Sequence, residues 1–279
     1  MNLADIHTPG PIGIFDSGYG GLTILEGIRK LMPGNDYLYL GDNARAPYGT
    51  RSFEVVYQFT LQAVERLFAL GCQLVILGCN TASAKALRSI QQLDLPHLAP
   101  DRRVLGIIRP TVEAIGSYTK TGHIGIFGTP GTIRSRSYDI EIAKLYPDFV
   151  TTGQECPMWV PLVENREFDN PGADYFVEKY IDTLLHRDTK IDTTLLACTH
   201  YPLLLRKIRK HTPPNVSIVT QGDIVARSLQ NYLERHPEMA ARVSRNGTVR
   251  YLTTESAEKF SEMGSLFLAK DIKAQSITL

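Results

Sequence analysis

The sequence is short of cysteine and of net charge. Its 279 residues include four cysteines, and 30 Lys and Arg against 29 Asp and Glu leave a formal charge of +1 at neutral pH. Four cysteines in a chain of this length are too few for a disulfide scaffold, so we expect free thiols. A charge near zero offers no general attraction for nucleic acid, and the single basic run, Arg206 to Lys210, is spaced like a solvated helix face. We therefore expect no nucleic-acid partner.

Long hydrophobic runs are also missing. No apolar stretch approaches the roughly 18 residues that a membrane helix needs. The segment from Met1 to Pro9 lacks the basic region followed by a hydrophobic one that marks a secretory signal. We therefore expect no membrane partner and a cytoplasmic location, where reducing conditions keep cysteines as thiols.

What the sequence does contain is an alternation of short apolar runs with helical patterns. Hydrophobic residues make up 43% of the chain and charged residues 21%, which is ordinary for a globular protein. Strands that alternate with helices predict an α/β fold with mainly parallel sheets and helices on both faces. Strands are expected at residues 12–15, 37–40, 74–77, 104–108, 124–127, 194–197 and 216–219, and helices at 22–31, 52–69, 81–93, 132–145, 171–186, 202–210 and 224–234.

The length of the chain predicts about two domains. A polar, proline-bearing stretch from Gln92 to Arg103 separates the first three expected strands from the rest, and we place a boundary near it. We expect residues 1–107 and 213–279 to form one α/β domain and residues 108–212 to form the other.

The two halves of the chain repeat the same local pattern. Each opens with a strand, a glycine-rich turn and a helix, and the turns are Asp16-Ser17-Gly18-Tyr19-Gly20-Gly21 and Gly128-Thr129-Pro130-Gly131-Thr132. Such turns can present backbone N–H groups to a carboxylate or a phosphate. They are equally typical of turns that need glycine only for their backbone geometry.

Two cysteines occur in matching contexts. Cys79 follows the strand expected to end at Leu77, Cys198 follows the strand expected to end at Ala197, and a helical pattern comes after each. Ligands bind at the carboxyl ends of strands in open α/β sheets. A helix N-terminus favours a thiolate, so a thiol with an ordinary pKa of about 8.5 could be partly ionised there. Two such thiols facing one pocket could act as an acid and a base on opposite faces of a substrate.

Six motifs occur in order along nearly the whole chain. They are Asp16-Ser17-Gly18-x-Gly20-Gly21, Ala46-Pro47-Tyr48-Gly49, Cys79-Asn80-Thr81-Ala82, Gly128-Thr129-x-x-Thr132, the stretch from Cys156 to Glu164, and Cys198-Thr199-His200-Tyr201-Pro202. Together they closely resemble the aspartate/glutamate racemase family, and within it the glutamate racemases.

The resemblance implies a racemase that interconverts L- and D-glutamate without cofactor or metal, the D-form being destined for bacterial peptidoglycan. It also implies two pseudo-symmetric α/β domains with the active site in the cleft between them, and a homodimer. Cys79 and Cys198 would be the catalytic acid and base, with Asp16 supporting Cys79, and His200 with Glu164 supporting Cys198. The substrate would be bound by Asp16, Ser17, Pro47, Tyr48, Gly49, Asn80, Thr81, Thr129, Thr199 and His200.

The sequence departs from the usual family pattern in two places. Many relatives carry a small, glycine-containing segment where this chain has Arg109 to Glu113, and the turn Gln221-Gly222-Asp223 replaces a more usual Asp-Ser-Gly. In the family these positions flank the site without performing its chemistry.

Other interpretations remain open on the sequence alone. The chain could be a racemase for aspartate or another amino acid, or a non-catalytic binding protein with the same fold. Cys79, Cys198 and His200 could in principle bind zinc, although Cys-x-His without a second close pair is a poor structural-zinc pattern. Cys72 and Cys156 lack the setting at a helix start, and we expect them to be structural.

Overall fold

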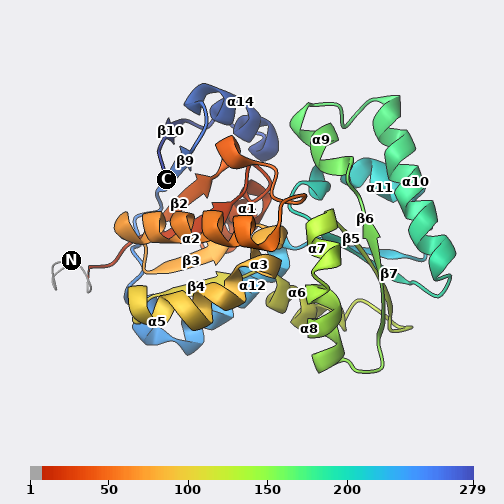
Figure 1. Ribbon diagram of the computed structural model, residues 1–279, viewed down its shortest axis with the longest axis horizontal. Coiled ribbons are helices and arrows are strands. Elements are labelled where there is room, and N and C mark those ends of the chain that lie inside the picture. Colours follow the sequence, from red (N-terminus) through yellow and green to blue (C-terminus); the bar gives the residue numbers. More distant parts are fainter. Residues whose placement is uncertain (1–7) are drawn as a thin grey trace.

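The computed structural model describes residues 8–279 and folds them around two parallel sheets (Figure 1). Residues 1–7, with which the predicted first domain begins, lie outside the described residues. The larger sheet contains, in spatial order, β10 (Ala274–Ser276), β9 (Val249–Thr253), β2 (Tyr37–Gly41), β1 (Ile12–Asp16), β3 (Leu74–Leu77) and β4 (Arg103–Gly106). The smaller sheet contains β6 (Val150–Glu155), β5 (His123–Gly128), β7 (Thr193–Ala197) and β8 (Ser217–Val219).

Helices cover both faces of each sheet, because the strands alternate their side chains between two cores. In the larger sheet, Ile14 and Tyr39 face α1 and α12, whereas Phe15 and Leu40 face α2. The larger sheet is accompanied by α1 (Leu22–Leu31), the 3-10 turn Asn43–Arg45, α2 (Phe53–Ala69), α3 (Asn80–Lys85), α4 (Leu87–Ser89), the π-turn Ile90–Asp94, α5 (Leu95–Leu98), α12 (Gly222–Arg235), α13 (Pro237–Ala240) and α14 (Ala257–Leu268).

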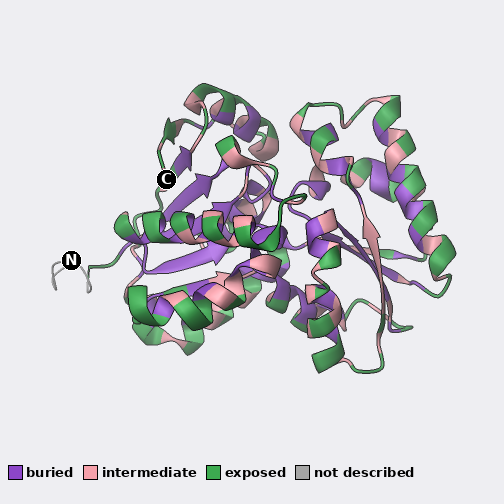
Figure 2. Cartoon of the chain, in the orientation of Figure 1, coloured by how far each residue is buried: buried purple, intermediate pink, exposed green. Residues whose placement is uncertain are grey.

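The smaller sheet is packed in the same way, and strands of both sheets are largely buried (Figure 2). Phe127 and Leu196 face α9 and α10, and Ile126 faces α6 and α8. The helices of this region are α6 (Ile108–Ile115), α7 (Pro130–Arg134), α8 (Ser137–Leu145), α9 (Trp159–Glu164), α10 (Pro171–Arg187), the 3-10 turn Tyr201–Leu204 and α11 (Leu205–His211). The predicted α/β fold with mainly parallel sheets is confirmed.

The register of the strands brings the predicted turns together. Phe15 pairs with Leu77 in the larger sheet, so the chain leaves β1 and β3 at the same edge, next to Ser17 and Cys79. In the smaller sheet Gly128 pairs with Ala197, and the turns that begin at Thr129 and Cys198 are neighbours in the same way. Each sheet therefore presents one glycine-rich turn and one cysteine turn at its carboxyl edge.

Several predicted boundaries are wrong in detail. The strand expected at residues 104–108 ends at Gly106, because Ile108 already begins α6. The helix expected at 132–145 is broken at Arg136, whose φ of 54° is left-handed and cannot continue a right-handed helix. The helix expected at 81–93 is likewise divided into short α-helical and π-helical pieces.

The predicted domain division also needs one correction. It assigned residues 213–279 to the first domain, but β8 pairs with β7 and so belongs to the smaller sheet. The chain returns to the larger sheet only after Val219, through α12 and β9. The rest of the division stays a prediction. No helix within residues 8–279 is long and apolar enough to cross a membrane.

Candidate active site

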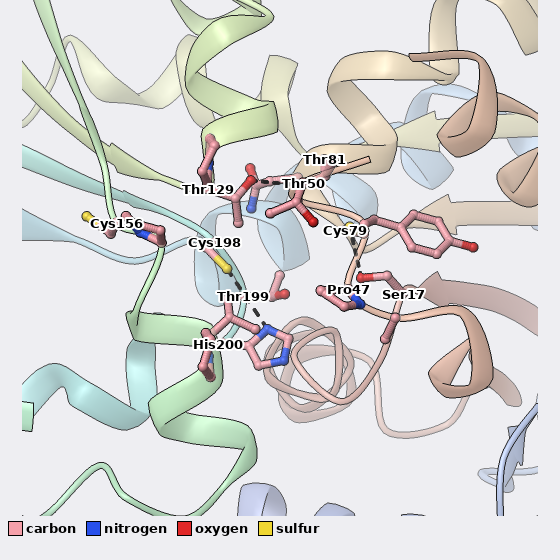
Figure 3. Close-up of a pocket in the computed structure, with 18 of the residues that line it drawn as sticks. Ser17, Pro47, Thr50, Cys79, Thr81, Thr129, Cys156, Cys198, Thr199 and His200 are labelled. Atoms are coloured by element: carbon pink, nitrogen blue, oxygen red, sulfur yellow. Dashed lines mark hydrogen bonds between the residues drawn. The ribbon is translucent and has the colours of Figure 1, made fainter. Parts of the chain in front are cut away.

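A cavity of about 110 Å³ lies between the carboxyl edges of the two sheets (Figure 3). This size suits a small ligand, since a single water needs only about 15 Å³ and drug-sized pockets start near 300 Å³. All of the residues that the sequence predicted for the site, except Asp16, line this cavity: Ser17, Pro47, Tyr48, Gly49, Cys79, Asn80, Thr81, Thr129, Glu164, Cys198, Thr199 and His200.

The first thiol caps a short helix. Cys79 follows β3 in an extended conformation, and its Sγ accepts from the backbone N–H of Ala82 at 3.5 Å. The Ser17 hydroxyl lies 3.5 Å from the same sulfur. The side chain that touches Cys79 from the glycine-rich turn is thus Ser17 rather than Asp16.

Burial dominates the ionisation of Cys79. Desolvation and the nearby charge of Asp16 raise the pKa of this thiol to about 12, against the smaller opposing effects of Ser17 and Ala82. The expectation that the helix start would leave this thiol partly ionised is therefore wrong for Cys79. Cys79 is only 6% exposed, and in this geometry its thiol keeps its proton at neutral pH.

The second thiol faces a histidine. Cys198 follows β7, and its Sγ lies 3.9 Å from Nδ1 of His200, while Nε2 of His200 lies 3.0 Å from a carboxylate oxygen of Glu164 at the end of α9. Burial works to lower the pKa of His200, but its hydrogen bonds to Cys198 and Glu164 outweigh it and raise this pKa to about 10. The Cys198 side of the cavity thus carries a cation at neutral pH, whereas the Cys79 side carries a neutral thiol.

Asp16 does not line the cavity, and it joins its own glycine-rich turn to the turn of Cys198. It ends β1, and its carboxylate accepts from the Gly18 N–H at 2.8 Å and from the Thr199 hydroxyl at 3.3 Å. Burial raises the pKa of Asp16, and the neighbouring His200 and the N–H groups of the turn oppose this rise. The role predicted for Asp16, support of Cys79, stays a prediction, because its hydrogen bonds run to the turn of Cys198.

Two glycines allow loops to approach across the cavity. A Cβ at Gly20 would lie 2.3 Å from the Thr199 hydroxyl and 2.4 Å from Nδ1 of His200. A Cβ at Gly49 would lie 2.8 Å from the Cβ of Thr129. Close backbone approach, rather than an unusual φ angle, is therefore the reason for glycine at both positions.

Hydroxyl groups join the two domains at the upper side of the cavity in Figure 3. The Thr81 hydroxyl lies 3.0 Å from that of Thr129, which also caps α7 by accepting from the Thr132 N–H. The loop that contains Gly49 is held to α7 by its carbonyl, which accepts from the Gly131 N–H at 2.7 Å. The Tyr48 hydroxyl donates to Asp42 and is thus committed to the first domain. Neutral donors of this kind suit a carboxylate ligand in a dry site.

The structure adds residues that the sequence did not predict for the site. Cys156, expected to be structural, follows β6 and lines the cavity, although the residue is 1% exposed and its thiol donates to the Gln154 carbonyl. Phe267 of α14 packs edge-on against His200, with ring centroids 5.7 Å apart. The remaining additions to the cavity wall are Ala46, Thr50, Pro130, Pro157, Val160 and Pro161. Most are apolar and come from α7, α9 and loops, which no periodic pattern in the sequence predicted.

All four cysteines are free, as predicted, and all four are buried. Among the residues that the structure describes, no three His, Cys, Asp or Glu side chains are grouped so that they could hold a metal ion.

Comparison with known proteins agrees with this arrangement. The sequence profile of the Asp/Glu/hydantoin racemase family matches residues 22–229 of the chain. The chain belongs to this family. A glutamate racemase from Ruegeria sp. (strain TM1040) is 39% identical over 271 residues, covering 94% of this chain and 97% of that protein.

Solved structures of the family have the same fold over the same length. A glutamate racemase from Bacillus anthracis superposes with a TM-score of 0.88 at 33% identity, covering 98% of this chain and 99% of that one. One from Francisella tularensis, solved in complex with D-glutamate, gives a TM-score of 0.85 at 28% identity and covers 97% and 98% of the two chains. The chain is therefore a racemase, an isomerase built on the two-domain fold of this family.

Proposed function

We propose that this racemase interconverts L- and D-glutamate by a two-thiol acid and base mechanism that needs no cofactor, and that it supplies D-glutamate for peptidoglycan. The observation that carries the proposal is the pair of thiols, Cys79 and Cys198, which line one small cavity from two different sheets. Racemisation removes the α-proton from one face of the substrate and returns a proton to the other. Two groups on opposite sides of a cavity meet that requirement, and one group does not.

The different surroundings of the two thiols support a starting state in which Cys79 is the acid and Cys198 is the base. Cys79 keeps its proton and can act as the acid, and Cys198, whose Sγ lies 3.9 Å from Nδ1 of the cationic His200, is placed to act as the base. In this state the Cys198 thiolate takes the α-proton of L-glutamate, and Cys79 donates its proton to the opposite face. The product is D-glutamate with the thiol and thiolate exchanged, and proton exchange with solvent restores the first state.

Glutamate is supported as the substrate by the wall of the cavity and by the relatives. The hydroxyls of Ser17, Thr81 and Thr129 and the amide of Asn80 supply neutral donors for two carboxylates. The relative from Ruegeria and both structural neighbours named above are glutamate racemases, and one of those neighbours holds D-glutamate. We propose the same substrate here.

The first experiment is circular dichroism of L-glutamate incubated with dialysed, metal-free protein. We expect the signal to decay to zero at the full rate, with no gain from pyridoxal phosphate and no loss with a chelator. A parallel incubation with L-aspartate tests whether aspartate is the substrate instead. Binding of glutamate without α-proton exchange would indicate a non-catalytic relative. A need for pyridoxal phosphate or metal would rule out the two-thiol mechanism.

The second experiment separates the two sulfurs. Cys79→Ser and Cys198→Ser should bind glutamate but lose racemisation by orders of magnitude, because serine is far less acidic than cysteine. A glutamate analogue with a good leaving group at the β-carbon needs only proton abstraction to eliminate. We expect Cys198→Ser to eliminate from the D-form and Cys79→Ser from the L-form.

Cys72→Ser is the matched control, because it removes a buried thiol that does not line the cavity. It should keep racemisation and both eliminations. Equal loss of elimination from both enantiomers in both active-site variants would point to a single base and contradict the assignment.

A further inference from the structure

Behind the cavity, four side chains from four segments form a closed hydrogen-bonded cluster. Asn80 of α3 donates through Nδ2 to Oε1 of Gln221 at 2.7 Å. Gln221, just before α12, donates through Nε2 to the hydroxyls of Tyr138 at 2.8 Å and of Thr111 at 2.9 Å. Tyr138 of α8 donates to Oδ1 of Asn80 at 2.6 Å, which closes the ring. All four residues are buried, and Thr111 and Gln221 come from the two segments that depart from the family pattern.

The donors and acceptors of the cluster can be assigned in only one consistent way. The Thr111 hydroxyl donates its single hydrogen to the backbone carbonyl of Ile107 at 2.7 Å, so it can only accept from Gln221. The amide group of Gln221 that meets Thr111 must then be the NH₂, and its carbonyl oxygen must face Asn80. Asn80 therefore presents Nδ2 to Gln221 and Oδ1 to Tyr138. The backbone carbonyl of Ile107, just before α6, thus decides the orientation of the Asn80 amide.

Asn80 is the one member of this cluster that lines the cavity. Its Nδ2 has a second N–H that the cluster does not use. A reversed amide would offer a carbonyl oxygen in place of that donor, which would repel a carboxylate. The orientation of the Asn80 amide, which the cluster fixes, therefore decides whether this residue attracts or repels an anionic ligand.

We propose that Thr111, Tyr138 and Gln221 are positioning residues that hold the Asn80 amide as a hydrogen-bond donor to a substrate carboxylate. This inference rests on the proposed function. Tyr138 and Asn80 come from α8 and α3, which accompany different sheets, so the amide is fixed only when the two domains are in contact. The cluster makes the donor dependent on the closed arrangement of the domains.

The test uses Tyr138→Phe, which removes one hydroxyl and keeps the ring in place. We expect the KM for both enantiomers of glutamate to rise by about tenfold, the effect of one hydrogen bond to a charged group. The pH dependence should keep its shape, because the thiols and His200 are not members of the cluster. Thr111→Val should also raise KM, because it removes the hydroxyl that orients the Gln221 amide. Tyr146→Phe is the matched control, because its hydroxyl donates to the Glu113 carbonyl, outside the cluster, and it should leave KM unchanged.

A double-mutant cycle distinguishes positioning from a general structural role. In an Asn80→Ala background, Tyr138→Phe should have no further effect on KM, because the group that it positions is gone. Additive effects of the two substitutions, or an unchanged KM in Tyr138→Phe, would overturn the inference.

A measurement independent of turnover completes the test. In nuclear magnetic resonance spectra the side-chain NH₂ of Asn80 should exchange slowly with solvent in the wild type, and faster in Tyr138→Phe and Thr111→Val. Equal exchange in all three proteins would overturn the inference even if glutamate is the substrate. A wild type that does not racemise glutamate contradicts the proposed function instead, and the exchange measurement still decides whether the cluster holds the amide.

Discussion

At the scale of single residues, Glu164 raises the pKa of its neighbour His200. Its carboxylate lies 3.0 Å from His200, which in turn faces the Cys198 sulfur, so a charge at the end of α9 acts on a thiol that follows β7. The glutamate side chain is 26% exposed, whereas that of the histidine is 6% exposed. Glu164 is thus the member of the pair that solvent reaches.

Glu164→Gln should lower the pKa of His200 from its raised value near 10, because one of the two interactions that favour the cation is lost. The alkaline limb of turnover from L-glutamate should therefore move to lower pH, with kcat/KM reduced by about tenfold at pH 8. The pH profile of racemisation measures this. Glu155→Gln, which removes a carboxylate paired with exposed Arg134, is the control and should keep the wild-type profile. An unshifted limb in Glu164→Gln would mean that another group titrates there.

Gly20→Ala should reduce both stability and activity, because its Cβ would meet Thr199 and His200 at less than the contact distance of real Cβ atoms. Overpacking of this kind typically costs about 1–3 kcal/mol of unfolding free energy. Urea titration and kcat/KM together measure the effect. Gly34→Ala is a matched control, since a Cβ there meets no atom within 4 Å, and it should change stability by less than about 0.5 kcal/mol. Equal effects of the two substitutions would contradict the account of Gly20.

At the scale of elements, a buried or half-buried aspartate at the amino edge of each sheet binds neighbouring loops through hydrogen bonds. Asp36, just before β2, accepts from the backbone N–H of Thr248 at 2.9 Å and from the Asn246 amide at 2.7 Å. Asp192, just before β7, accepts from the N–H groups of Lys120 and Thr121 and from the Thr119 hydroxyl. These contacts hold the loops at the edge of each sheet that lies opposite the cavity.

Asp192→Asn should destabilise the protein by about 1–2 kcal/mol near pH 7. Partial burial disfavours the charge of Asp192, but the hydrogen bonds from residues 119–121 outweigh it and lower its pKa to about 2. Because the folded-state pKa is lowered, the stabilisation is present above the unfolded value of about 3.9 and is lost as the pH falls to about 2. Unfolding measured from pH 7 to pH 2 should therefore show the wild type and the variant converging. The exposed Asp148→Asn is the control, and a difference that persists at pH 2 would contradict this explanation.

At the scale of the whole molecule, the site exists only where the two domains meet. Besides the cluster around Asn80, the contacts across this junction include Thr81 with Thr129, Gly49 with Gly131, and the Thr23 hydroxyl with the Thr199 carbonyl at 3.1 Å. Neither sheet alone carries both thiols. Binding and closure should therefore be one event.

Glutamate should slow amide hydrogen exchange in both domains at once, at residues 16–21 and 46–50 in one and at 129–132 and 198–200 in the other. At a hundred times its Kd, glutamate should stabilise the protein by about 2.7 kcal/mol. Alanine, which lacks the side-chain carboxylate, is the control and should give weaker protection. Protection confined to one domain would contradict a site shared between the two. The homodimer predicted from the family resemblance is tested separately, by sedimentation.

The sequence by itself determined the local units of this protein. A buried apolar run, a small or thiol-bearing turn and a helix start are properties of neighbouring residues, so β1, β3, β5 and β7 and the turns that follow them could be predicted. Their repetition in the two halves was enough to place Cys79 and Cys198 at equivalent positions.

Only the tertiary structure decided the rest, because it depends on contacts between residues distant in the chain. Three strands, the two edge strands β6 and β10 and the inner strand β9, were not predicted, since partly exposed strands such as Val150–Glu155 lack a continuous apolar run. Neighbouring residues in the sequence give no sign of three further features. These are the pairing of β8 with the smaller sheet, the packing of α14 against His200 and the cluster around Gln221. The raised pKa of Cys79 is of the same kind, because desolvation by the folded protein outweighs the local effect of a helix start.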